Sequence, residues 1–131
     1  MTDVVARAFR RAGVDLQSLV HEDMRAHFNA YPHCCGLRTT DSNIDHRRVP
    51  NLMTFFTRKG HSLPASKDPA LYQPGDVVAW RLSNGLPHTG IVSDQRSFDG
   101  SRYLIVHNIG AGAKVEDILF AFAIIGHYRY F

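Results

Sequence analysis

The hydrophobic pattern of this 131-residue chain changes its period near residue 76. Before that point apolar side chains recur every three to four residues, as in amphipathic helices, and after it short runs that are separated by turn residues are typical of strands. The first pattern predicts helices over residues 2–12, over 15–30 and from Pro50 to Gly60. Helices followed by strands are typical of an α+β domain, in which N-terminal helices pack on an antiparallel sheet formed by the C-terminal half.

The second half of the chain predicts strands that are joined by tight turns. Asn-Gly and Asp-Gly pairs separate the first strands, and such pairs favour hairpins. A chain of this length forms one domain, so we expect a single unit over residues 1–131. Its helical part covers about 1–60 and its sheet part about 76–131. The expected strands are Asp76–Arg81, His88–Asp94, Tyr103–Asn108 and Ile124–Phe131, with a short helix over Lys114–Phe120.

Charge and hydropathy exclude several classes of function. The formal net charge is +3, but no basic cluster is longer than Arg47-Arg48, so we do not expect nucleic-acid binding. The longest apolar run, Ile118–Ile125, is too short to span a bilayer. No apolar stretch follows Met1, and the chain as written is therefore expected to stay in the cytoplasm. The oligomeric state is left open.

Two of the eight histidines, His88 and His107, flank one predicted hairpin. If its turn centres near residues 97–98, position 88 pairs with position 107. Paired residues in an antiparallel ladder point to the same face, about 5 Å apart, whereas a one-residue slip would separate them onto opposite faces. Two adjacent imidazoles suit a general base and the group that orients it. The alternative is a structural pair at the end of a sheet.

Short motifs along the whole chain resemble an uncharacterised bacterial domain family related to NlpC-type papain-like cell-wall hydrolases. The most distinctive motif is the string Asp41–Asn51. The remaining motifs, in chain order, are Thr2–Val5, Gly13–Leu16, His21–Met24, Tyr72–Trp80, His88–Val92, Val106–Gly110 and Gly126–Arg129.

The resemblance implies a papain-like domain in which an N-terminal helix carries a nucleophilic cysteine and an antiparallel sheet carries its histidine base. It identifies His88 as the base and His107 as the polar residue that orients the base. The implied activity is that of a cysteine peptidase or amidase that acts on amide bonds, with cell-wall peptides as the expected substrate and no cofactor. Members of such a family are expected to be exported to the periplasm or envelope.

One departure from the family pattern affects the chemistry. The resemblance places the nucleophilic cysteine just before Thr2, where this sequence has Met1. A thioether is not a nucleophile of this kind, and loss of a triad nucleophile removes about 10⁶-fold of rate. We therefore expect a chain that is truncated at its N-terminus and inactive. A non-catalytic peptide- or muropeptide-binding domain and the product of a truncated gene without function remain as alternatives.

The polar segment that follows the second predicted helix supplies candidates for substrate binding. Arginine binds carboxylates through two parallel hydrogen bonds, and cell-wall peptides carry several carboxylates. The alternative is a solvated loop with ion pairs and no binding role. Cys34 and Cys35 are expected to be free thiols, because neighbouring cysteines rarely reach disulfide geometry. Together with His33 and His46 they match no standard zinc spacing, so no metal site is expected. The substrate-binding candidates are Asp45, His46, Arg47, Arg48 and Asn108.

Overall fold

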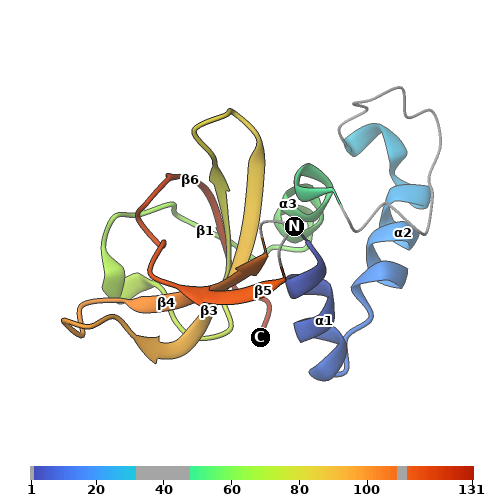
Figure 1. Cartoon of the computed structure of the whole chain (residues 1–131). Coiled ribbons are helices and arrows are strands. Elements are labelled where there is room, and N and C mark those ends of the chain that lie inside the picture. The colour runs from blue at the N-terminus through green and yellow to red at the C-terminus, as the bar shows by residue number, and fades with distance from the viewer. Residues whose placement is uncertain (1, 32–47, 109–111) are drawn as a thin grey trace.

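A computed structural model describes residues 2–31, 48–108 and 112–131. Within these ranges the helices come first and the strands of an antiparallel sheet follow (Figure 1), so the predicted α+β class is confirmed. No helix in the described ranges is both long enough and apolar enough to cross a bilayer. The helices are α1 (Asp3–Arg11), α2 (Leu16–Ala26) and α3 (Val49–Arg58), with short 3₁₀ turns η1 (Phe28–Ala30) and η3 (Pro69–Leu71).

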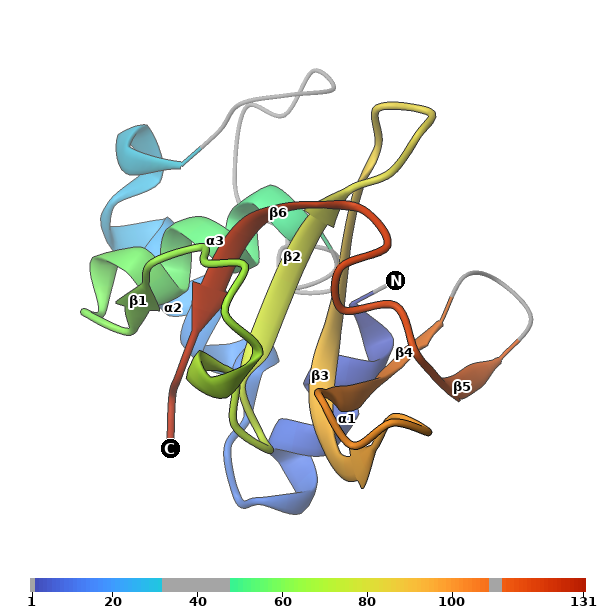
Figure 2. The same cartoon turned by 90° about the vertical axis from the view of Figure 1, so that its left-hand side faces the viewer.

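The described strands form one six-stranded sheet with the order β1-β6-β2-β3-β4-β5. The last strand of the chain therefore lies inside the sheet, between β1 and β2, and Figure 2 shows β6 beside β2. The strands are β1 (Ser62–Leu63), β2 (Val77–Arg81), β3 (Pro87–Arg96), β4 (Tyr103–Asn108), β5 (Ala113–Glu116) and β6 (Ala123–Tyr128).

Local chemistry sets the helix boundaries. Gly13 has a φ of 85°, which only glycine adopts readily, and it ends α1 with a sharp turn. The Asp15 side chain then accepts a hydrogen bond from the backbone N–H of Ser18 and caps α2. The prediction of one helix over residues 15–30 was too long, because α2 ends at Ala26 and η1 follows as a separate turn.

Two further expectations on secondary structure were wrong. Residues 114–120 were expected to form a helix, but the structure has strand β5 over Ala113–Glu116. Ala113 and Val115 alternate with Lys114 and Glu116 as in a strand, but the run is only four residues long and all four are exposed, which is too little to distinguish a strand from a helix. No strand was expected between Gly60 and Asp76, but Ser62 and Leu63 pair with β6 at the sheet edge. A strand of two residues is too short to show the alternation of apolar and polar residues by which strands are predicted.

The middle of the sheet is buried on both faces, and β2 contributes to each. Val77 and Ala79 point toward the helices and belong to what we call the helix-side core. Val78 and Trp80 point the other way into the loop-side core, which consists of Tyr72, Val78, Trp80, Val92, Ile105 and Leu119. A strand buried on both faces reads as a continuous apolar run rather than as an alternation. The helix-side core consists of Val5, Phe9, Leu16, Val20, Met24, Tyr31, Val49, Leu52, Phe55, Phe56, Val77, Ala79 and Tyr128.

Candidate functional site

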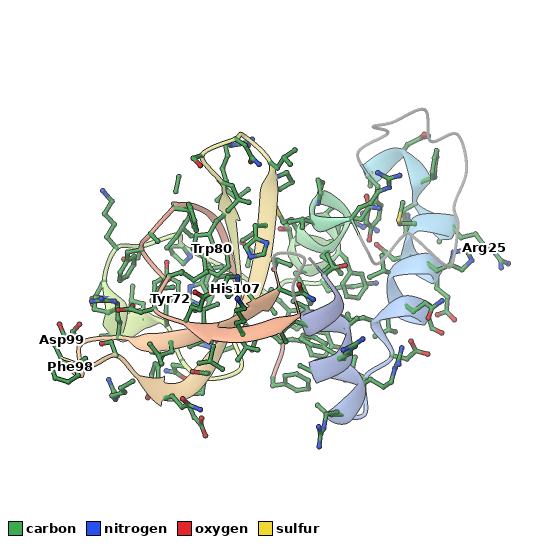
Figure 3. All side chains as sticks on the ribbon, viewed as in Figure 1. Arg25, Tyr72, Trp80, Phe98, Asp99 and His107 are labelled. Carbon is green, nitrogen blue, oxygen red and sulfur yellow. The ribbon has the colours of Figure 1, made fainter. Side chains whose placement is uncertain are left out.

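The two histidines that the sequence singled out touch in the structure. Nε2 of His88 lies 2.9 Å from Nδ1 of His107, within hydrogen-bond distance. The two rings meet edge to face at 79°, and their side chains are buried, with 0% and 2% of their residue surface exposed. Figure 3 labels His107 and Trp80 over the middle of the sheet, away from the tip of the β3–β4 hairpin at Phe98.

The predicted pairing of position 88 with position 107 was wrong by two residues. In the ladder Gly90 faces His107, while His88 faces Trp80 on the other side of β3. The shift arises because β3 continues to Arg96, with an irregularity between Val92 and Arg96. An even shift preserves the side-chain face, and His88 therefore contacts His107 along the diagonal of the ladder.

Gly90 leaves the space that this diagonal contact needs. A Cβ at this position would lie 2.8 Å from both Cγ2 of Ile105 and the carbonyl oxygen of Val106, and 3.2 Å from Cβ of His107. These distances are shorter than ordinary van der Waals contacts. A side chain at position 90 would thus displace β4, and with it the His107 imidazole that leans toward His88.

Trp80 holds the His88 ring in place. The indole stacks on this imidazole at 5.9 Å between ring centroids, with 29° between the planes. Its Nε1–H donates a hydrogen bond to the carbonyl oxygen of Leu119 at 2.9 Å, which anchors the indole in the loop-side core. Burial, with a further contribution from His107, lowers the pKa of His88 to about 4. His88 is therefore neutral at pH 7 and able to accept a proton.

A third member of the group, Glu116, was missed by sequence reasoning. Its Oε1 lies 2.8 Å from Nε2 of His107, and 48% of its side-chain surface is exposed. The expected helix over Lys114–Phe120 gave no reason to place this carboxylate beside β4. The signal that could have found it is Gly112, which follows β4 closely and suits a hairpin back into a neighbouring strand.

The remaining ring nitrogen of His88, Nδ1, is buried and has no hydrogen-bond partner among the described residues. Helix α1 packs against β3 and β4, and both views show its first turn beside these strands (Figures 1 and 2). Thr2, at the N-terminal end of α1, is 1% exposed. The site therefore combines a buried imidazole nitrogen with a helix that begins on the strands that carry it.

Two of the other predicted site residues, Asn108 and Arg48, lie in the described part of the chain. Asn108 is half-buried at the end of β4, and because side chains alternate along a strand it faces away from the side of His107. Arg48 precedes α3 as its N-cap residue and is half-buried. The binding roles of both stay predictions. Met1, His33, Cys34, Cys35, Asp45, His46 and Arg47 lie outside the described residues.

The described part of the chain contains no cluster of three or more histidine, cysteine, aspartate or glutamate side chains that could hold a metal ion. It does contain a second buried ionic group, formed by Asp76, His127 and Arg129. Oδ2 of Asp76 lies 2.6 Å from Nε2 of His127, and the Arg129 guanidinium donates to both carboxylate oxygens at 2.9 Å. Tyr72 stacks on the His127 ring at 4.2 Å. This group ties the segment before β2 to the end of β6.

Comparison with known proteins places the chain in a family but not near a solved fold. Residues 1–130 match the family model described as "Domain of unknown function (DUF1287)". The chain is 58% identical over 130 residues to "Uncharacterized protein YijF" of Escherichia coli (strain K12). That match covers 99% of this chain and 63% of the relative, so the chain spans less than two thirds of the relative's length. No solved structure matches it. The chain belongs to the DUF1287 family.

Proposed function

We propose that this domain carries the acid–base machinery of a papain-like cysteine hydrolase that acts on amide bonds in cell-wall peptides. The observation that supports the proposal is the buried His88–His107 hydrogen bond, with Nδ1 of His88 left without a described partner. A general base needs one nitrogen that is held in position by a neighbour and one that is open to the nucleophile. His107 serves as the neighbour.

The nucleophile belongs, by the family resemblance, immediately before Thr2. A thiol at the start of a helix has a lowered pKa, because unpaired N–H groups and the helix dipole stabilise the thiolate. The nine-residue helix α1 fits this role, since it packs on the strands that carry His88 and His107. This sequence has Met1 at that position, and the chain with Met1 is accordingly expected to lack hydrolase activity.

In a chain with cysteine at position 1, the chemistry would follow from the geometry. The thiol proton moves to Nδ1 of His88, and the thiolate attacks the amide carbonyl carbon. His88 then gives this proton to the departing amine as the C–N bond breaks, and water hydrolyses the thioester. The negative thiolate would raise the pKa of His88 above its present low value, because an opposite charge favours the imidazolium.

The decisive experiment restores the thiol. Met1 is replaced by cysteine in a chain extended upstream by a short linker, with Cys34→Ser and Cys35→Ser to remove other thiols. We expect iodoacetamide to alkylate the new thiol roughly ten times faster than free cysteine at neutral pH, because more of it is thiolate. The same protein is then assayed for release of amines from peptidoglycan peptides.

The controls separate a general base from an unspecific effect on the helix. His88→Gln should slow the alkylation toward the rate of free cysteine, whereas His27→Gln, at an exposed position at the end of α2, should leave the rate unchanged. A new thiol that reacts no faster than free cysteine, or one that is indifferent to His88→Gln, would contradict the proposal.

A further inference from the structure

Three side chains from three adjacent strands form a continuous relay. Oε1 of Glu116 on β5 lies 2.8 Å from Nε2 of His107 on β4, and Nδ1 of His107 lies 2.9 Å from Nε2 of His88 on β3. The two imidazoles are buried, whereas the Glu116 side chain is 48% exposed. The relay therefore begins at the surface and ends at the buried Nδ1 of His88.

The chemistry of its outer end gives the relay a direction. A carboxylate oxygen accepts hydrogen bonds and has none to donate. Nε2 of His107 must then carry the hydrogen, and in a neutral imidazole its Nδ1 is left with a lone pair. That lone pair accepts from Nε2–H of His88. In neutral His88 the other nitrogen, Nδ1, consequently carries a lone pair and no hydrogen.

We propose that Glu116 is a positioning residue that fixes the tautomers of both histidines, so that Nδ1 of His88 is held as the proton acceptor. The role as base rests on the proposed function, but the tautomer assignment does not. A neutral amide or a hydroxyl at position 116 could donate or accept, and either direction of the relay would then be allowed. A lysine can only donate, and would favour the reverse direction.

The experiment reads the hydrogen positions directly, by ¹⁵N NMR of the histidine side chains in the chain with Met1 at neutral pH. We expect both rings to carry hydrogen on Nε2 and none on Nδ1. Glu116→Gln should give a mixture of tautomers, and Glu116→Lys should move hydrogen onto Nδ1 of His88. Because Glu116 is half-exposed on an edge strand, both variants should fold.

Glu22 provides the matched control, since it is the other glutamate of the sequence and lies exposed on α2. Glu22→Gln and Glu22→Lys should leave both rings as in the parent protein. A doubly protonated His107 in the parent protein, or tautomers that Glu116→Lys does not alter, would overturn the assignment.

A second readout links the relay to reactivity. In the variant with cysteine at position 1, Glu116→Lys should slow alkylation by up to about 10-fold, because His88 can no longer accept the thiol proton at Nδ1. If that thiol is unreactive even with Glu116 in place, the proposed function fails while the tautomer result stands. If it is reactive and Glu116→Lys leaves both its rate and the tautomers unchanged, the role of Glu116 fails alone.

Discussion

His88 is neutral because of its surroundings rather than its own chemistry. Trp80 stacks on it and His107 meets it edge to face, so water does not reach the ring. A charge in such a place costs free energy that no described counter-ion beside Nδ1 offsets. The residue is thereby suited to receive a proton only when a negative partner forms next to it.

This burial makes the stability of the protein dependent on pH. The pKa of His88 is about 4 in the folded chain, against an ordinary value of 6.5, so between these values the unfolded chain binds a proton that the folded chain does not. The contribution of His88 to the free energy of unfolding is therefore fully present above pH 6.5. It is lost as the pH falls toward 4, and the loss is of the order of 3 kcal/mol. Urea unfolding over this range should show a shallower loss for His88→Gln than for the parent.

The control for this pH dependence is a histidine that lies outside the relay. His27→Gln, at an exposed position, should lose stability with falling pH in parallel with the parent protein. If the curve for His88→Gln is also parallel to that of the parent, then burial of His88 does not penalise its protonation.

At the same scale, the sequence predicted the relay only in part. It identified the His88–His107 pair because side-chain parity survives a register error of two residues, and the irregularity after Val92 shifts the ladder by such an even step. Glu116 could not be found in this way. Its role depends on β5 pairing with β4, and the alternation in β5 covers only four residues, all of them exposed, which is too short to distinguish a strand from a polar loop or helix.

Among the elements, α2 and α3 are joined by a buried carboxylate. Oδ2 of Asp23 accepts from Nε of Arg58 at 2.7 Å and from the Tyr31 hydroxyl, and Lys59 lies 3.3 Å from Oδ1. The Arg58 hydrogen bond holds the pKa of the Asp23 carboxyl well below its usual range, although burial opposes this. Tyr31 and Arg48 border segment 32–47, so this tie fixes the elements on either side of it.

Replacing this carboxylate should weaken the packing of α2 on α3. Asp23→Asn leaves the partners of a buried acceptor partly unsatisfied, and we expect a loss of about 1–3 kcal/mol in the free energy of unfolding. Asp117→Asn is the matched control, since Asp117 also accepts two hydrogen bonds from one arginine, Arg102, but its side chain is 38% exposed. That change should cost less than about 1 kcal/mol. Equal losses in the two variants would show that burial of Asp23 adds nothing.

Over the whole molecule, β2 joins two cores that lie on opposite faces of one sheet. Neither core is independent, because two consecutive residues of the same strand are buried in different cores, Ala79 in the helix-side core and Trp80 in the loop-side core. The periodicity of the sequence predicted helices packed on a sheet, but not that β6 would lie beside β2. The pairing of β6 with β2 joins segments that are far apart in the sequence, and no local pattern predicts it. The Asp76–Arg129 ion pair stabilises it.

The shared strand predicts that the molecule unfolds as one unit. Trp80, the only tryptophan of the sequence, reports on the loop-side core by its fluorescence, while circular dichroism reports on the helices. The two urea transitions should coincide. Phe56 is fully buried among aromatic rings of the helix-side core, so Phe56→Ala should lower the free energy of unfolding by about 3–5 kcal/mol and shift both transitions equally. Phe98→Ala, at a fully exposed hairpin tip, should shift neither. A fluorescence transition that keeps its parental midpoint in Phe56→Ala would mean that the two cores unfold separately.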